Sequence, residues 1–144
     1  MKRAQVTFDL LIAVMLITVT VAGIVSVASG EIESAGVLDT TAKLKVFAVD
    51  LRDTAVKSYS VGANFTAIKS SPIQLSNGDE ITVKLYSSNS TILITAKLGG
   101  KTFVVGQNVP VPLCDSEVEL TAGGESFNVT AVSAGGRRCV TVKK

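Results

Sequence analysis

The sequence predicts an α+β fold in which a long N-terminal helix, first hydrophobic and then amphipathic, precedes a C-terminal antiparallel β-domain. No charged side chain occurs between Leu10 and Gly30, whereas charges recur every few residues from Glu31 onward. From about Thr66 the apolar periodicity changes to short alternating runs separated by turn residues, which is typical of antiparallel strands. Within 144 residues these features describe one small module.

The composition leaves little room for enzymatic chemistry. The chain contains no His, which removes the commonest general base, the Ser/His and Cys/His nucleophile pairs and the usual zinc sites. Neither a glycine-rich phosphate loop nor a Cys-x-x-Cys motif occurs. The formal net charge of +2 is too small to indicate nucleic acid as a partner. We therefore expect a protein that is not an enzyme and that uses no cofactor.

The apolar run of residues 10–30 has the length of a membrane-spanning helix. At ~1.5 Å per residue it extends about 30 Å, which matches the hydrocarbon core of a bilayer. It is longer than the apolar part of an ordinary secretory signal, although Ala28-Ser29-Gly30 is a weak match to a cleavage site. Lys2 and Arg3 precede the run, so the positive-inside rule places the N-terminus in the cytoplasm and the rest of the chain outside. A single-pass anchor is the simplest interpretation, and a removed signal peptide is an alternative.

Asp9 lies at the edge of this run, where an acid is costly unless a partner neutralises it. In the first helical turn, the helix dipole together with Lys2 and Arg3 would favour its negative charge. A second interpretation of Asp9 depends on the residues around it.

The N-terminus reads Lys2-Arg3-Ala4, then Gln5, with Thr7 and Asp9 at the third and fifth positions counted from Gln5. This pattern resembles archaeal type IV pilin-like proteins with a class III signal peptide. In that family a short basic leader is cut before Gln, Ser occupies the third mature position and Glu the fifth, and a hydrophobic helix follows directly. Thr7 and Asp9 stand here in place of that Ser and Glu.

The resemblance implies that residues 1–4 are a leader, cut between Ala4 and Gln5 by a membrane-embedded prepilin peptidase. The helix of residues 5–59 would stay attached and, with a pilus assembly platform and its ATPase, assemble copies of the chain into a helical homopolymer. In this family the acid at the fifth mature position contacts the N-terminal amine of a neighbouring subunit, a role that falls to Asp9. Cyclisation of the N-terminal Gln would remove that amine and leave only hydrogen bonding.

The helix is expected to continue beyond the membrane as an amphipathic extension over residues 31–59. No Pro occurs there, and Gly36 is the only Gly. Apolar or small side chains recur at spacings of three and four and form one packing stripe: Val37, Thr40, Leu44, Phe47, Leu51 and Thr54. The stripe fits packing on the β-domain of its own chain and packing against other subunits equally well. Ser60, Gly62 and Asn64 would end the helix.

Residues 60–144 form the predicted exported β-domain of six or seven strands. Alternating apolar residues predict strands over 81–86, 92–98, 101–105, 118–120, 127–131 and 140–142. Glycine pairs predict three hairpins, at Gly99-Gly100, Gly123-Gly124 and Gly135-Gly136. Pro110 and Pro112 indicate an edge or a crossover between sheets. A small sandwich and a twisted sheet wrapped on the helix both fit this pattern.

Cys114 and Cys139 both lie in the predicted exported domain. Their even number, strand-end positions and oxidising compartment favour a disulfide over two free thiols, and a metal site would need more ligands. Closing a loop of about 25 residues would stabilise the domain by roughly 3–4 kcal/mol in the chain-entropy model. The acidic pairs Asp79-Glu80 and Asp115-Ser116-Glu117 are more often solvated loop residues than Ca²⁺ ligands, so we expect no metal site.

Three N-x-Ser/Thr sequons begin at Asn64, Asn89 and Asn128, and their predicted exported position is compatible with N-glycosylation. Asn89, in a polar loop, is the best candidate for exposure. Arg137-Arg138 and the terminal Lys143-Lys144 predict one small basic patch. Such a patch is more often a solvated turn and tail than a contact for an acidic glycan, DNA or a negatively charged surface.

Two classes of function fit these features. We expect a structural subunit of an extracellular archaeal type IV pilus-like filament, with adhesion or a related surface role. Its precursor would sit in the membrane with a cytoplasmic N-terminus before it joins the surface filament. The alternative is a non-polymerising, single-pass envelope protein whose β-domain binds an S-layer or surface-machine component. Adhesion follows from the family resemblance rather than from a visible site.

Overall fold

A computed structural model describes the chain except residues 1, 64 and 135, and except the side chains of residues 2–7, 32–34 and 134. Across this described part, α1 (Lys2–Val61) is followed by seven strands: β1 (Thr66–Ser70), β2 (Glu80–Tyr86), β3 (Thr91–Leu98), β4 (Lys101–Asn108), β5 (Ser116–Thr121), β6 (Ser126–Ala134) and β7 (Arg137–Lys143). This order is the α+β arrangement that the sequence predicts. The chain divides into two compact units, one ending at Asp39 and one spanning Thr40–Lys144.

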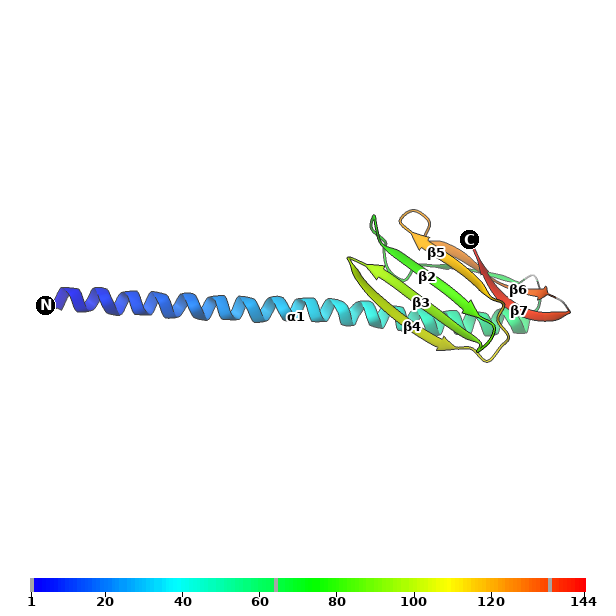
Figure 1. Ribbon diagram of the computed structural model, residues 1–144, viewed down its shortest axis with the longest axis horizontal. Coiled ribbons are helices and arrows are strands. Elements are labelled where there is room, and N and C mark those ends of the chain that lie inside the picture. The colour runs from blue at the N-terminus through cyan, green and yellow to red at the C-terminus, as the bar shows by residue number, and fades with distance from the viewer. Residues whose placement is uncertain (1, 64, 135) are drawn as a thin grey trace. The chain divides into compact units, whose positions relative to one another are not determined.

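The strands form two antiparallel sheets (Figure 1). One sheet has the strand order β4-β3-β2-β5 and the other the order β1-β6-β7. Gly99 and Gly100 connect β3 to β4 with φ angles of 54° and 78°, the positive values that a two-residue hairpin turn of this type requires. β6 and β7 also pair with each other, starting from Ala134 opposite Arg137. Two of the three predicted hairpins are therefore confirmed.

The third predicted hairpin, across Gly123-Gly124, is wrong. β5 pairs with β2, whereas β6 lies between β1 and β7 in the other sheet. Val118 and Leu120 of β5 lie opposite Val83 and Ile81 of β2, and all four side chains are buried. The alternation of β5 thus completes the apolar face of the four-stranded sheet, and the chain then crosses to the other sheet. Alternation identifies a strand but does not specify its partner.

Both sheets share one hydrophobic core with the C-terminal part of α1. The helix contributes Leu44, Phe47, Ala48, Leu51 and Ala55 to this core. Three of the six residues of the predicted stripe, Leu44, Phe47 and Leu51, belong to this core, and Thr54 is also buried. Figure 1 shows the strands lying along this part of the helix. The helix therefore packs on the sheets of its own chain.

Side-chain contacts hold the helix against all three strands of the three-stranded sheet. Phe47 meets Phe127 of β6 edge to face, with ring centroids 6.3 Å apart, an arrangement that aromatic pairs favour. Lys69 of β1 forms an ion pair with Asp50 at 2.7 Å. The guanidinium of Arg138 in β7 lies 5.9 Å from the ring centroid of Tyr59, within the range of a cation–π contact.

The helix ends at a glycine. Gly62 has a φ of 118°, and its N–H donates to the Ser58 carbonyl at 3.3 Å. A glycine just past the last helical residue adopts this backbone conformation without the steric penalty of a Cβ. The helix extends to Val61, two residues beyond the predicted end at residue 59, and the predicted ending residue Asn64 lies outside the described residues.

Candidate functional site

The N-terminal unit presents a continuous apolar surface. Every described side chain from Phe8 to Glu31 is exposed, and the large apolar ones are exposed by 42–66%: Phe8, Leu10, Leu11, Ile12, Val14, Met15, Leu16, Ile17, Val19, Val21, Ile24, Val25 and Val27. By length and composition this helix is able to cross a membrane. Exposed apolar surface on this scale is unfavourable in water, so it marks a surface made for lipid or protein.

Three of the four hydroxyl side chains between Leu10 and Gly30 form hydrogen bonds within the helix itself. Thr18, Thr20 and Ser29 each donate a hydrogen bond to the backbone carbonyl four residues earlier, at 2.8–2.9 Å. A hydroxyl bonded in this way carries no unmet donor into an apolar environment. The segment is therefore suited to surroundings without water.

The predicted assembly residues belong to the beginning of this helix. Asp9 is exposed on α1. The side chains of Ala4, Gln5 and Thr7 lie outside the described residues, so the cleavage position and the pairing of Asp9 with a neighbouring subunit stay predictions.

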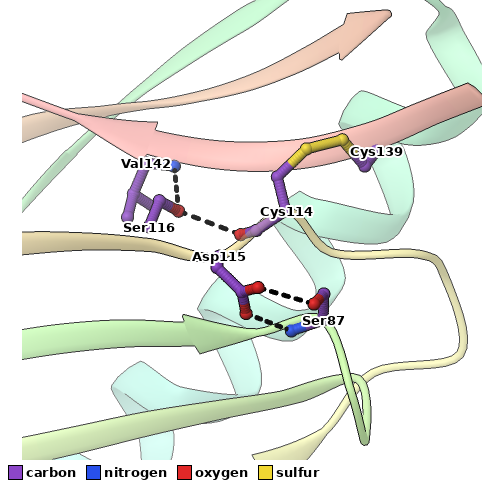
Figure 2. The surroundings of a disulfide bond; sticks show 6 residues. All are labelled: Ser87, Cys114, Asp115, Ser116, Cys139 and Val142. Atoms are coloured by element: carbon purple, nitrogen blue, oxygen red, sulfur yellow. Dashed lines mark hydrogen bonds between the residues drawn. A yellow bond between two sulfur atoms is a disulfide. The ribbon is translucent and has the colours of Figure 1, made fainter. Parts of the chain in front are cut away.

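A disulfide joins Cys114 to Cys139, with Cα atoms 5.4 Å apart (Figure 2). This is the pairing that the sequence predicts. Cys139 belongs to β7, while Cys114 lies in the segment that leads from β4 into β5. The bridge therefore connects the three-stranded sheet to the segment that begins the outer strand of the four-stranded sheet.

Backbone hydrogen bonds reinforce this connection. The Cys114 N–H donates to the Val140 carbonyl at 2.8 Å, and the Val140 N–H donates to the Pro112 carbonyl at 3.0 Å. The Ser116 hydroxyl donates to the Cys114 carbonyl and accepts a hydrogen bond from the Val142 N–H, both at 3.2 Å (Figure 2). We call the line along which β7 meets residues 112–116 the seam. Pro112 and Ser116 act through Val140 and Val142, and Val142 is 26 residues from Ser116 in the chain. No local sequence pattern therefore identifies their roles.

The acidic residues next to the turns hold backbone groups in place. Asp115 accepts hydrogen bonds from the Ser87 N–H and from the Ser87 hydroxyl, both at 2.7 Å (Figure 2). The Ser87 N–H, followed by its hydroxyl, lowers the pKa of Asp115. Asp79 accepts from the Gly99 and Ser76 N–H groups at 2.9 and 3.0 Å, and these bonds lower its pKa in the same way.

Asp79 and Asp115 thus stabilise turns through hydrogen bonds and do not lie together in a cluster. Within the described residues, no group of three or more His, Cys, Asp or Glu side chains is arranged to hold a metal ion. Glu80 bonds to Thr82 and Lys97, and Glu117 pairs with Lys84 at 3.0 Å. The two acidic pairs singled out in the sequence are therefore used within the four-stranded sheet and its turns.

Comparison with known proteins adds nothing to these features. No protein-family model, curated protein or solved structure matches this chain. Function has to be inferred from the chain's own residues, above all from the apolar helix surface.

The described sequons occupy different environments. Asn89 is exposed in the turn between β2 and β3, whereas Asn128 is half-buried within β6. Asn64 lies outside the described residues. The sequence motif does not distinguish these positions, because it carries no information about strand pairing.

The four basic residues near the C-terminus do not form one patch. Arg137 begins β7 and Lys143 ends it, so about 20 Å of extended chain separates the two pairs. Arg138 contacts Tyr59, and the Lys144 ammonium donates to the Glu119 carbonyl at 3.1 Å. The expectation of a single basic patch is wrong, because residues close in the sequence lie at opposite ends of an extended strand.

Proposed function

We propose that this chain is a structural subunit of an extracellular filament that assembles through its N-terminal helix. The observation that carries this proposal is the contrast within α1. From Leu44 onward the helix buries one face in its own domain, whereas none of the described side chains from Phe8 to Glu31 is buried. The apolar N-terminal surface therefore needs an external partner, either lipid or other copies of the same helix.

The composition of the apolar segment supports helix association. Ala13, Ala22, Gly23 and Ala28 are small residues, and small residues allow helices to approach closely where lipid provides no hydrophobic drive for association. If one face of the subunit contacts a different face of the next copy and the rotation does not close, repetition produces an open helical polymer. In such a polymer the N-terminal helices replace the lipid that surrounded the precursor.

The proposal includes removal of residues 1–4 before assembly. The pattern Lys2-Arg3-Ala4, Gln5, Thr7 and Asp9 supports it through the resemblance to archaeal type IV pilin-like proteins. Loss of the two basic residues would leave Asp9 without those nearby positive charges, so the acid would need another neutralising group. The N-terminal amine of a neighbouring subunit is our candidate, and the surface role that we propose for the filament is adhesion.

A permanently anchored envelope protein is the second candidate, because lipid alone would also cover the apolar helix surface. Intact mass and N-terminal peptide mapping separate the two. The native protein would be recovered from sheared surface material and, separately, from membranes. A chain that begins at Gln5, or at its cyclised form, in the sheared fraction supports the filament. A chain that retains residues 1–4 and occurs only in membranes would overturn it.

Replacing Asp9 with Ala tests the assembly mechanism. We expect Asp9→Ala to insert into the membrane normally but to lower the yield of sheared filaments roughly tenfold or more, because about 1.4 kcal/mol of lost contact per subunit changes an association constant tenfold. Asp9→Glu keeps the acid and should restore assembly. Glu31→Ala, which removes another exposed carboxylate of the same helix, is the matched control. Normal filament yield from Asp9→Ala would rule out the proposed contact.

A further inference from the structure

We propose that Asn89 is an N-glycosylation site of the folded β-domain, modified by an oligosaccharide transferred from a lipid-linked phosphate donor, and that Asn128 stays unmodified. The inference rests on the proposed export of the domain, because such donors are used on the exported side of a membrane. Its support is the different way in which the structure presents two identical motifs.

The Asn89 sequon lies in an exposed connection. β2 ends at Tyr86 and β3 begins at Thr91, and no residue from Tyr86 to Thr91 is buried. Asn89 is itself exposed. Among the described residues, none forms a hydrogen bond with its carboxamide. The carboxamide that would carry the glycan therefore belongs to an exposed residue and has no competing hydrogen bond within the described part of the chain.

The turn is held at its ends rather than at Asn89. Asp115 binds the Ser87 N–H and hydroxyl at 2.7 Å, and the Ser90 carbonyl accepts a hydrogen bond from the Val109 N–H at 2.8 Å. Ser90 has a φ of 49°, a left-handed conformation that non-glycine residues adopt mainly in turns. These contacts present Asn89 at the tip of the turn.

The sequon is also able to enter a transferase without opening the core. The Thr91 hydroxyl donates to the Asn108 side-chain oxygen at 3.0 Å, a surface hydrogen bond that an enzyme group is able to replace. The first fully covered residue beyond the sequon is Ile92. Residues 87–91 are therefore able to extend while Ile92 and the sheet behind it stay packed.

The Asn128 sequon lacks this freedom. Asn128 lies in β6, the central strand of its sheet, opposite Ile68 of β1 and Lys143 of β7. Phe127 and Val129 on either side of it are buried in the core. Access of a transferase to Asn128 would require β6 to separate from both neighbours and to withdraw these two side chains. Folding thus closes this sequon and leaves Asn89 open.

The transfer step balances as a substitution at the sugar. The Asn89 Nδ2 atom attacks the anomeric carbon of the donor and forms a carbon–nitrogen bond. The bond between that carbon and the phosphate oxygen breaks, and its electron pair leaves with the lipid-linked phosphate. Nδ2 loses one proton to a base of the transferase, so no oxidant or reductant takes part.

Peptide mapping of the protein from its native host tests the inference. Cleavage after Lys and Arg places Asn89 in the peptide of residues 85–97 and Asn128 in the separate peptide of residues 102–137. We expect a glycan mass on the first peptide and none on the second. Asn89→Gln and Thr91→Val should remove the glycan, whereas Thr91→Ser, which keeps the sequon, and Asn128→Gln should retain it. Thr91→Val preserves the shape of the side chain, so its loss of glycan would reflect the missing hydroxyl.

Two outcomes would overturn the inference. The first is an unmodified 85–97 peptide, and the second is a glycan on Asn128, which would mean that transfer precedes folding. The N-terminal mass of the same sample keeps this test separate from the filament proposal. A chain beginning at Gln5 with an unmodified Asn89 contradicts only glycosylation. A chain retaining residues 1–4 with a glycan on Asn89 contradicts only the filament.

Discussion

At the scale of single residues, Asp115 shows how one carboxylate organises a surface loop. It binds two donors of Ser87, and it stands between Cys114 of the disulfide and Ser116 of the seam. Its bonds to Ser87 favour the charged form, which is why its pKa is lowered. The turn that carries Asn89 is therefore coupled to the ionisation of a neighbouring acid.

This coupling predicts a pH dependence of stability. Because the pKa of Asp115 is lower in the folded than in the unfolded chain, its contribution is present above the unfolded value of about 4 and is lost as the pH falls through the folded value. We expect Asp115→Asn to be less stable than the wild type at pH 7, with the gap closing below about pH 4. The midpoints of urea unfolding of both proteins at several pH values measure this difference in stability. Asp53→Asn serves as a control for the loss of one surface charge, and a gap that stays constant with pH would contradict the assignment.

The sequence identifies some of these residues but not their partners. The Cys114–Cys139 pairing follows from the even number of cysteines and their placement. The roles of Asp115 and Ser116 do not, because each depends on a residue that only the folded chain brings near. The sequence shows which chemical group each residue carries. The partner of that group depends on the fold, because the two residues lie far apart in the chain.

At the scale of elements, local periodicity predicts α1 better than it predicts the sheets. The stripe through Leu44, Phe47 and Leu51 is buried as expected, since a helix uses neighbours three and four residues apart. Six of the seven strands lie close to the predicted ranges, whereas β1 (Thr66–Ser70) has no counterpart among them. The hairpin between β5 and β6 is wrong because strand pairing depends on which buried faces match across the core.

The seam supplies the element-scale prediction. Cys114→Ser combined with Cys139→Ser should lower the free energy of unfolding by about 3–4 kcal/mol, since the bridge spans a sequence separation of 25 and cross-linking restricts the unfolded chain. Urea unfolding of the β-domain, followed by circular dichroism, measures this loss. Reduction of the wild-type disulfide should reproduce it, while the same reductant should leave the double variant unchanged. Equal midpoints for the oxidised wild type and the double variant would show that the bridge contributes no stability.

At the scale of the whole molecule, the two units differ in how their apolar side chains are buried. All buried core residues, from Leu44 to Val142, belong to the unit Thr40–Lys144. The N-terminal unit contributes exposed apolar surface. Removal of the proposed leader would also take away Lys2 and Arg3, leaving 12 basic and 12 acidic side chains from totals of 14 and 12. A subunit without net charge opposes self-association less than a charged one.

This division predicts that the two parts separate cleanly. A fragment of residues 31–144 should be soluble, folded and monomeric without detergent, because it retains the complete core and lacks the apolar run. The chain of residues 5–144 should require detergent or lipid. Sedimentation of the two fragments compares their association states, and circular dichroism compares their folding. Aggregation or unfolding of the shorter fragment would show that the N-terminal segment is needed to form the domain.

The seam also has a mechanical meaning. A tensile force along α1 would enter the domain through Leu44, Phe47 and Leu51 and be shared between two sheets that pack on the same helix. When two strands are peeled apart, the hydrogen bonds between them break one at a time. A covalent bond between the strands does not break at such forces. Because Cys114 is bonded to Cys139, β7 and the segment that precedes β5 would stay joined even where the hydrogen bonds between them break. The bridge thus limits how far the two sheets are able to separate under load.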